Sequence, residues 1–408
     1  MPEPSSFLTE DDLEPFVQHL VGPDRTDPWC WLFYGDSITH DAAHTNGWRS
    51  IPKHLLREWV SRFIQELWGI GKWQREFSEN SIFMTLKPTA AIRSESHSVS
   101  RRSMKGFNDM NKKVISATVS PLLENGSLDK AGLKNILERN IRHGLDGVFL
   151  FGSMGEWGSF SNAFKEEALE LACCIVDHRM KLLAGINATS LPLSLEIMKS
   201  YRKYDFDAYV FMPPGKTSAL DPVKSVLAVL DAADRPVYLY HCPPANGINF
   251  TLGQFETMMK HPNLKGIKNS SSNMWLRREL LLMRAEKGYK TRFFEGQEWA
   301  ADEALIAGYD GMICGMGALC SKMMRKLADC VDRGDIAGAI EAQNNMIRVF
   351  HGVYGINIEN CWNGQKYALV KLGLIASPFT YAQEMDSLTA EAKKRIEKCL
   401  EEFKTELD

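Results

Sequence analysis

From Val114 onward, apolar runs of about five residues recur at intervals of roughly 20 to 35 residues. The runs are rich in Val, Ile, Leu and aromatic residues and are too short for helices, so the pattern predicts buried β-strands. Eight strands are predicted, at residues 114–119, 147–151, 181–186, 208–212, 236–240, 264–268, 291–295 and 311–315.

Helical patterns fill the segments between these runs. Leu128–Lys130 carries the start signal of one helix, and Asn162 is predicted to cap another, which has Glu166 and Glu167 in its first turns. Eight strand–helix units in about 210 residues fit a closed (β/α)8 barrel better than an open doubly wound sheet, and no G-x-G-x-x-G follows the first strand. The predicted fold class is therefore α/β, with a TIM barrel over residues 113–320.

Helical periodicity continues beyond the predicted barrel. It covers residues 323–331, 336–349, 365–372 and 390–403. This pattern predicts a C-terminal helical extension over residues 321–408. Asn360–Asn363 is predicted to be a loop that approaches the active site, and no role is assigned to it.

The amino-terminal region has a different pattern. Trp29–Tyr34 predicts a buried strand that runs into the turn Gly35–Ser37, and a helical pattern covers residues 48–70. A strand, a sharp Gly-Asp-Ser turn and a helix can present a nucleophilic serine above a sheet. Residues 28–68 thus resemble the first block of the GDSL-type SGNH hydrolases.

The rest of that hydrolase pattern is missing between residues 70 and 112, which hold no oxyanion glycine, asparagine block or Asp-x-x-His of the family type. Three histidines that offer a base stand in the wrong chain order, namely His40, His44 and His54. We therefore predict a truncated, partial α/β fragment over residues 1–80, in which Ser37 is inert. A serine-rich, disordered linker is predicted over residues 81–112.

Composition narrows the function. The 408 residues carry 48 Lys and Arg against 51 Asp and Glu, a formal net charge of −3, which gives no electrostatic footprint for nucleic acid or for an anionic membrane. The nine cysteines form no C-x-x-C pair and no cluster at zinc spacing, so free thiols in a reducing cytoplasm and no metal are expected. No signal-peptide core and no apolar run of about 18 residues is found. Small-molecule chemistry is favoured.

In a barrel of this type, functional groups lie at the carboxyl ends of the strands. A lysine, a tyrosine and a serine in a glycine-rich turn meet at this mouth. The residues at or after the eight ends are, in order, Thr118, Gly152–Glu156, Asn187, Pro213–Gly215, Tyr240–Pro244, Lys268, Glu295–Glu298 and Gly315–Gly317.

Lys268 is the residue on which the predicted chemistry depends. At the tip of a buried strand, desolvation lowers the pKa of its amine and frees it to attack a carbonyl as a Schiff-base nucleophile. The alternative is a strand-end lysine whose amine simply reaches solvent. The residues at the other strand ends favour the first interpretation.

Three motifs occur in a fixed order at these strand ends. Gly152–Glu156 aligns with G-[ST]-[TS]-G-E except at Met154, and Gly266–Ser270 aligns with G-x-K-[DE]-[ST] except at Asn269. Tyr240–Pro243 matches Y-x-x-P. Each motif is weak alone, but each follows the expected strand of the eight. Residues 113–405 therefore resemble the dihydrodipicolinate synthase/N-acetylneuraminate lyase family of class I pyruvate aldolases.

The resemblance implies imine chemistry without a cofactor or a metal. Lys268 would attack the ketone of pyruvate or another 2-oxo acid, and Tyr240 would be the acid and base at the C4 hydroxyl. Ser153 and the amides of its turn would bind the carboxylate. The family also implies a homo-oligomer, either a tetramer or a dimer. The substrate-binding residues that it implies are Gly152, Met154, Gly155, Gly296, Glu298 and Cys314.

Several departures from the family pattern narrow the substrate. Ala245 stands where the dihydrodipicolinate-forming members carry an arginine, so a second carboxylate loses its bidentate partner. Trp299 stands where the sialic acid lyases carry a carboxylate. Met154 replaces a hydroxyl residue, and Pro214–Gly215 replaces an aromatic pair that includes a relay tyrosine in the synthases. Together with Trp157, these residues predict an apolar mouth and a less hydroxylated substrate tail.

The favoured function is a carbon–carbon lyase or aldolase with pyruvate as product or donor, acting through an imine on Lys268. A sugar-acid dehydratase or a dihydrodipicolinate synthase-like condensation would use the same imine. A catalytically silent barrel for sensing or scaffolding is an alternative of another class, and an esterase centred on Ser37 is a further one.

Overall fold

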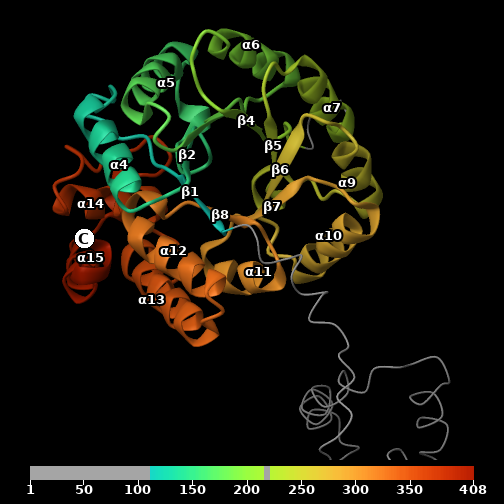
Figure 1. The fold of residues 1–408 in the computed structure, drawn as a ribbon. Coiled ribbons are helices and arrows are strands. Elements are labelled where there is room, and N and C mark those ends of the chain that lie inside the picture. The colour runs from blue at the N-terminus through green and yellow to red at the C-terminus, as the bar shows by residue number, and fades with distance from the viewer. Residues whose placement is uncertain (1–110, 216–220) are drawn as a thin grey trace, which may run out of the picture. The chain divides into compact units, whose positions relative to one another are not determined.

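Eight parallel strands close into a barrel in chain order in the computed structural model, which describes residues 111–215 and 221–408 (Figure 1). The strands are β1 (Lys113–Ala117), β2 (Gly147–Leu150), β3 (Lys181–Gly185), β4 (Ala208–Phe211), β5 (Val237–His241), β6 (Leu264–Asn269), β7 (Arg292–Glu295) and β8 (Gly311–Cys314). Each strand overlaps its predicted segment, so the predicted TIM barrel is confirmed. The hydrolase-like fragment and the linker up to residue 110 lie outside the described residues.

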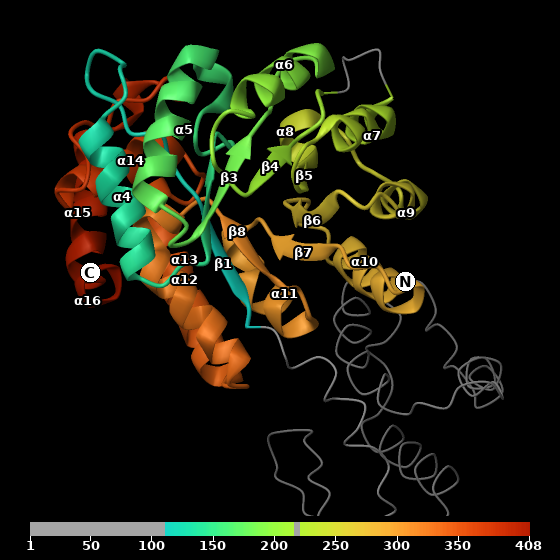
Figure 2. The same cartoon turned by 45° about the horizontal axis from the view of Figure 1, so that its top comes forward.

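Helices follow the strands and form a ring outside them (Figure 2). They are α4 (Lys130–Arg142), α5 (Asn162–Val176), α6 (Leu191–Tyr201), α7 (Pro222–Ala232), α9 (Leu252–Met259), α10 (Met274–Lys287), α11 (Ala301–Ala307) and α12 (Gly317–Asp332), with the short α8 (Pro243–Asn246) preceding α9. Because helices cover the outer face and side chains fill the interior, the strands are apolar on both faces. This arrangement explains the continuous apolar runs in the sequence.

The helix starts agree with the sequence signals except at one cap. The Asp129 carboxylate accepts a hydrogen bond from the Gly132 amide at 2.8 Å and begins α4 as predicted. The prediction that Asn162 caps α5 is wrong by one position. Ser161 is the cap, because its hydroxyl accepts from the Phe164 amide at 3.3 Å, and Asn162 is the first helical residue.

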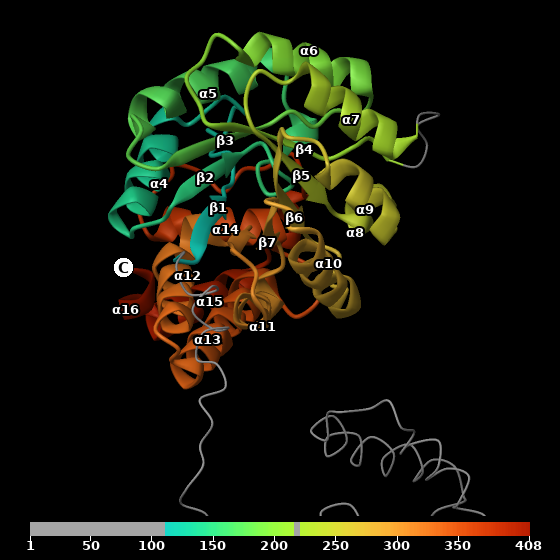
Figure 3. The same cartoon turned by 45° about the vertical axis from the view of Figure 1, so that its right-hand side comes forward.

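The C-terminal extension consists of helices that gather on one side of the barrel beside α12 (Figure 3). They are α13 (Ile336–Tyr354), α14 (Cys361–Lys371), α15 (Ala390–Glu402) and α16 (Lys404–Leu407). The prediction of a loop at Asn360–Asn363 is wrong, because α14 begins at Cys361. The Gln383 side chain accepts from the amides of Trp362 and Asn363 at 3.1 and 3.3 Å. This cap comes from a distant segment, so no local signal marks the helix start.

Large side chains fill the inside of the barrel. Phe149, Val210, Phe294 and Ile313 are almost fully buried there, and the Tyr240 ring packs among them. A second apolar layer lies between the strands and the outer helices, and a third joins α12 to the C-terminal helices. Apolar side chains fill the interior of the barrel. The polar side chains of Tyr240 and Lys268 lie near the carboxyl ends of β5 and β6.

Candidate active site

Lys268 and Tyr240 lie directly opposite each other on neighbouring strands. Lys268 of β6 is the register partner of Tyr240 of β5. The Lys268 amine lies 4.2 Å from the centre of the Tyr240 ring and 5.5 Å from the centre of the Phe149 ring. Because side chains alternate along a strand, the paired positions point to the same side, here the barrel interior. The structure thus brings together the two residues predicted for the chemistry.

Burial controls the charge of Lys268. The side chain is almost fully buried, and desolvation lowers the pKa of its amine. Cys242, Glu298, Cys314 and Glu295 act in the opposite direction, but burial dominates. A lowered pKa leaves more of the amine in its neutral form at a given pH, and the neutral form is the nucleophile.

The Tyr240 phenol is held as a proton donor. Its hydroxyl lies 3.2 Å from the Ser153 hydroxyl, which belongs to the turn after β2. Burial raises the pKa of Tyr240, and the nearby Cys242 adds to this effect, whereas the hydrogen bond with Ser153 lowers it. The phenol therefore stays protonated at neutral pH. The three predicted catalytic residues, Lys268, Tyr240 and Ser153, form one continuous cluster.

The turn Gly152–Glu156 has a tight backbone that requires glycine. A Cβ atom on Gly155 would lie 2.9 Å from the Phe151 amide nitrogen and 3.2 Å from that of Gly152. Phe151 and Glu156 both adopt left-handed backbone angles, with φ of 61° and 54°. The amides of Glu156 and Trp157 turn back onto the carbonyls of Ser153 and Gly152 at 3.1 and 3.3 Å. Tight turns of this type gather backbone amides into an anion-binding concavity.

The last residue of the turn, Glu156, is anchored in the C-terminal extension. Its fully buried carboxylate pairs with the amine of Lys366 in α14, whose side chain is also fully buried. The same carboxylate accepts from the Thr380 hydroxyl at 2.7 Å and from the Tyr381 amide at 2.8 Å. A buried charge is tolerated only when it is paired and hydrogen-bonded in this way. The pair therefore fixes the end of the turn to the helices that follow the barrel.

Helix α14 also contacts the turn directly. The Trp362 indole donates a hydrogen bond to the Ser153 carbonyl at 3.0 Å, and the Cys361 thiol contacts the Met154 sulfur at 3.6 Å. Sequence reasoning assigned no role to Trp362, Lys366 or Glu156. Glu156 closes the glycine-rich motif, which was a usable signal, whereas nothing local marks a lysine that is buried against a distant turn.

Three further residues that were predicted to bind substrate, Gly296, Cys314 and Met154, differ in their distance from Lys268 and in their packing. A Cβ atom on Gly296 would lie 2.0 Å from the Ser270 hydroxyl and 2.8 Å from Lys268 Cε, so glycine leaves room for the lysine. The Cys314 thiol is buried below the mouth and contacts the Glu295 carbonyl at 3.8 Å, and burial raises its pKa. Met154 packs against Cys361 and the C-terminal cluster.

Glu298 is occupied with the backbone that begins α12. One of its carboxylate oxygens accepts hydrogen bonds from the amides of Gly315 and Met316, the latter at 3.1 Å. Burial raises the pKa of this carboxyl, and Lys268 and these amides lower it. This Glu298 oxygen therefore anchors the backbone just before α12. A contact between Glu298 and a substrate hydroxyl, which the family pattern implies, stays a prediction.

A buried ion pair behind β7 supports the Gly296 segment. Arg277 of α10 binds the Glu295 carboxylate at 2.8 Å, and both side chains are nearly inaccessible. Glu295 also accepts from the amides of Gly296 and Gln297 at 3.0 and 2.9 Å. The pair holds in place the glycine beside which Lys268 lies.

The two tryptophans expected at the mouth lie in different places. Trp157 packs against the interior cluster, in line with an apolar mouth. Trp299 instead meets the Phe350 ring of α13, with ring centres 5.8 Å apart. Ala245 is exposed in α8, and the amide of its neighbour Asn246 donates to the Pro213 carbonyl at 3.0 Å.

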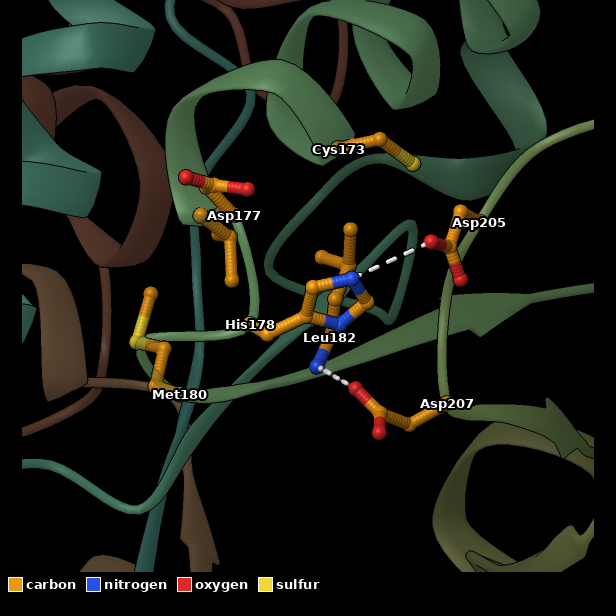
Figure 4. A pocket seen from close by; sticks show the side chains of 8 residues that line it. Cys173, Asp177, His178, Met180, Leu182, Asp205 and Asp207 are labelled. Carbon is orange, nitrogen blue, oxygen red and sulfur yellow. Dashed lines mark hydrogen bonds and ion pairs between the residues drawn. The ribbon is translucent and has the colours of Figure 1, made fainter.

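A separate hollow lies at the amino ends of β3 and β4, at the opposite end of the strands from Lys268 (Figure 4). Its lining includes Asp177, His178, Asp205 and Asp207. His178 pairs with Asp205 at 3.2 Å, and Asp207 accepts from the Leu182 amide at 2.8 Å.

In residues 111–215 and 221–408, no group of three or more His, Cys, Asp or Glu side chains could hold a metal ion, and no helix could cross a membrane.

Comparisons with known proteins agree with this geometry. The family model described as "Dihydrodipicolinate synthetase family" matches residues 110–403. An "Uncharacterized DapA-like lyase" of Rhizobium meliloti is 27% identical over 239 residues, which cover 58% of this chain and 79% of that protein. An N-acetylneuraminate lyase of Escherichia coli is 28% identical over 243 residues, with the same coverage of both chains.

Solved structures share the fold at low sequence identity. A monomeric dihydrodipicolinate synthase variant superposes with a TM-score of 0.67 at 18% identity, covering 74% of this chain and 99% of that one. The CdNal protein of Clostridium difficile, solved in complex with mannosamine, superposes with a TM-score of 0.65 at 22% identity, covering 72% of this chain and 99% of that one. At these sequence identities, the similarity supports a shared fold, namely the barrel and its C-terminal helices.

Proposed function

Because the chain belongs to the dihydrodipicolinate synthetase family, we propose that it is a class I pyruvate aldolase or lyase that works through an imine on Lys268. The observation that carries this proposal is the buried Lys268 amine 4.2 Å from the Tyr240 ring, with the Tyr240 hydroxyl 3.2 Å from Ser153. A desolvated amine, a protonated phenol and a glycine-rich turn are the groups that such a reaction needs.

In the proposed reaction, the neutral Lys268 amine attacks C2 of a 2-oxo acid and forms a protonated imine with loss of water. The imine accepts the electron pair of the C3–C4 bond when that bond breaks, and it supplies the enamine when the bond forms. Tyr240 removes the proton of the C4 hydroxyl during cleavage and returns it during condensation. The raised pKa of the phenol favours its protonated form in the resting site.

The carboxylate of the 2-oxo acid binds the turn Gly152–Gly155 in this proposal. Ser153 offers a hydroxyl, and the tight turn offers backbone amides. Met154 supplies no second hydroxyl, because its side chain is a thioether, and its sulfur contacts the Cys361 thiol. Binding of the carboxylate therefore relies on Ser153 and the amides.

We further propose that the second half of the substrate is short and carries neither a second carboxylate nor a long polyol. Ala245 has no guanidinium for a second carboxylate, and one oxygen of Glu298 is already bound by backbone amides. Trp157 adds apolar surface at the mouth. A condensation with aspartate semialdehyde and the cleavage of sialic acid are both disfavoured. A homo-oligomer remains a prediction from the resemblance, and a cytoplasmic location remains a prediction from the cysteine pattern.

The proposal is tested by trapping the imine. The full chain is incubated with pyruvate and borohydride, and the reduced pyruvyl adduct is measured by intact mass and mapped by peptide. We expect one adduct on Lys268 and its loss in Lys268→Ala. Lys265→Ala, at the exposed start of the same strand, is the matched control and keeps the adduct. An adduct that is absent from the wild type, or undiminished in Lys268→Ala, would refute the imine.

A further inference from the structure

Ser270 is a buried hydroxyl next to the reactive lysine that has no function in the reaction described so far. It follows β6 two positions after Lys268, so the strand alternation directs both side chains to the same face. The residue is 3% exposed. It therefore lies inside the site rather than on its rim.

The backbone of Ser270 is held on both sides. Its amide donates to the His241 carbonyl at 2.8 Å, which continues the pairing of β5 and β6 beyond the end of β6. Its carbonyl accepts from the Gln297 side chain at 2.9 Å. With both backbone groups bound, the hydroxyl is carried by a fixed frame. Fixed donors of this kind need little reorganisation during a reaction.

The hydroxyl makes no hydrogen bond of ordinary distance and angle with the described residues, although the Tyr240 phenol lies near it. Burying a hydroxyl without a partner is unfavourable, so buried polar groups in folded proteins are nearly always bonded. An unpartnered hydroxyl inside a binding site is the usual mark of a group whose partner is the ligand or a water molecule.

The neighbours of the Ser270 hydroxyl identify what that partner is. A Cβ atom on Gly296 would lie 2.0 Å from this hydroxyl and 2.8 Å from Lys268 Cε, so both groups border the same small space. On the other side, the hydroxyl is close enough to Tyr240 to lower the pKa of the phenol, although burial and Cys242 raise it more. The Ser270 hydroxyl thus lies near both the Tyr240 phenol and the end of the Lys268 side chain.

We propose that Ser270 is a catalytic residue that passes a proton from Tyr240 to the oxygen that leaves C2 during imine formation. This inference rests on the proposed function, because it needs a Lys268 imine. It gives the site two serines with separate roles: Ser153 holds the phenol beside the carboxylate turn, and Ser270 connects the phenol to the departing oxygen.

The proposed step balances as follows. The Lys268 lone pair forms the N–C2 bond while the carbonyl pair moves to oxygen, and a proton passes from nitrogen to that oxygen. The nitrogen lone pair then forms the C=N bond as the C2–O bond breaks. The leaving oxygen takes the Ser270 proton and departs as water, and Ser270 regains a proton from Tyr240. The serine is unchanged, and the phenolate recovers its proton from solvent or from the next step.

The test follows the oxygen atom itself. Pyruvate labelled with 18O at C2 loses its label only when the imine forms and is hydrolysed, apart from spontaneous hydration, which Lys268→Ala measures. In the full chain, Ser270→Ala is expected to slow label loss by about 100-fold or more. Ser270→Thr, which keeps a hydroxyl, restores most of the rate. The matched control is Ser271→Ala, because the Ser271 hydroxyl bonds the Asn273 amide outside this cluster.

Two further measurements separate catalysis from structure. Inhibition by lactate, which has the carboxylate but no carbonyl, is expected to be unchanged in Ser270→Ala. Its thermal stability is expected to equal or exceed that of the wild type, because the lost hydroxyl had no partner. Label loss at the wild-type rate in Ser270→Ala, or a parallel loss of lactate binding, would overturn the role of Ser270. Absence of the borohydride adduct from the wild type would instead overturn the imine chemistry as a whole.

Discussion

The reactivity of Lys268 depends on the balance between burial and nearby acidic groups. Burial lowers the pKa of its amine below the ordinary 10.5, while Cys242, Glu298, Cys314 and Glu295 raise it less. A lowered pKa means that the neutral amine is already dominant at a pH below 10.5. The initial rate of borohydride-trapped adduct formation is therefore expected to rise with pH and to level off below 10.5. Quenched samples analysed by intact mass across the pH range measure this profile.

A rate that keeps rising up to the ordinary pKa of lysine would contradict the desolvated amine. Replacing Glu298 by Gln provides a second check, because Glu298 opposes the lowering. In this variant, the midpoint of the profile is expected to move to lower pH, provided that the fold is retained by circular dichroism.

At the residue scale, the sequence predicted which side chains meet at the candidate site but not the residues that support them. Lys268, Tyr240 and Ser153 could be grouped because the carboxyl ends of parallel strands in a barrel meet at one mouth. Lys366 could not be grouped with them. Its partner Glu156 is 210 residues away, and a buried lysine on a helix has the same local pattern as an exposed one.

At the scale of elements, α14 braces the turn Gly152–Glu156, which is the carboxylate site of the proposed reaction. Replacing Trp362 by Phe removes the indole donor to the Ser153 carbonyl and keeps the aromatic ring. Loss of one hydrogen bond of about 1 kcal/mol weakens binding by about fivefold. We therefore expect the KM for a 2-oxo acid to rise about fivefold and kcat to change little, as measured by steady-state kinetics.

The matched control for this substitution is Trp275→Phe, since Trp275 is 76% exposed at the start of α10. It is expected to leave both constants unchanged. A fall in kcat with an unchanged KM in Trp362→Phe would contradict a role in positioning the carboxylate turn.

The boundaries of the helices show what local sequence signals can and cannot predict. The eight strands were predicted because each apolar run is short and is bounded by polar segments. The cap of α5 was placed one residue late, because Ser161 and Asn162 are adjacent residues of equal capping ability. The start of α14 was missed because Gln383, not a residue of its own first turn, accepts from its first amides.

At the scale of the whole molecule, the buried His241 makes a contribution to stability that is lost in acid. The His241 ring packs against Phe250 and Phe255, neither ring nitrogen has a partner among the described residues, and burial lowers its pKa to about 4. Between pH 6.5 and 4, the unfolded chain binds a proton that the folded chain does not, so stability falls as the pH falls. The full loss is about 3 kcal/mol.

His241→Phe is expected to flatten this part of the stability profile, whatever its effect at neutral pH. Chemical denaturation at a series of pH values measures the slope. His143, whose pKa burial and Arg139 also lower to about 4, keeps a second contribution in the variant. An unchanged slope in His241→Phe would show that the ring is already protonated or solvated in the folded protein.

The pairing of Glu156 with Lys366 also has a consequence for the order in which parts of the site form during synthesis. The ribosome makes the turn at Gly152–Glu156 before it makes the brace, because Lys366 follows Glu156 by 210 residues. All eight strands emerge before α14 does. A nascent chain can therefore close its barrel around Lys268 while the carboxylate turn is still unbraced. In the proposed reaction, a nascent chain that lacks α14 would therefore hold the Lys268 amine before its carboxylate-binding turn is braced.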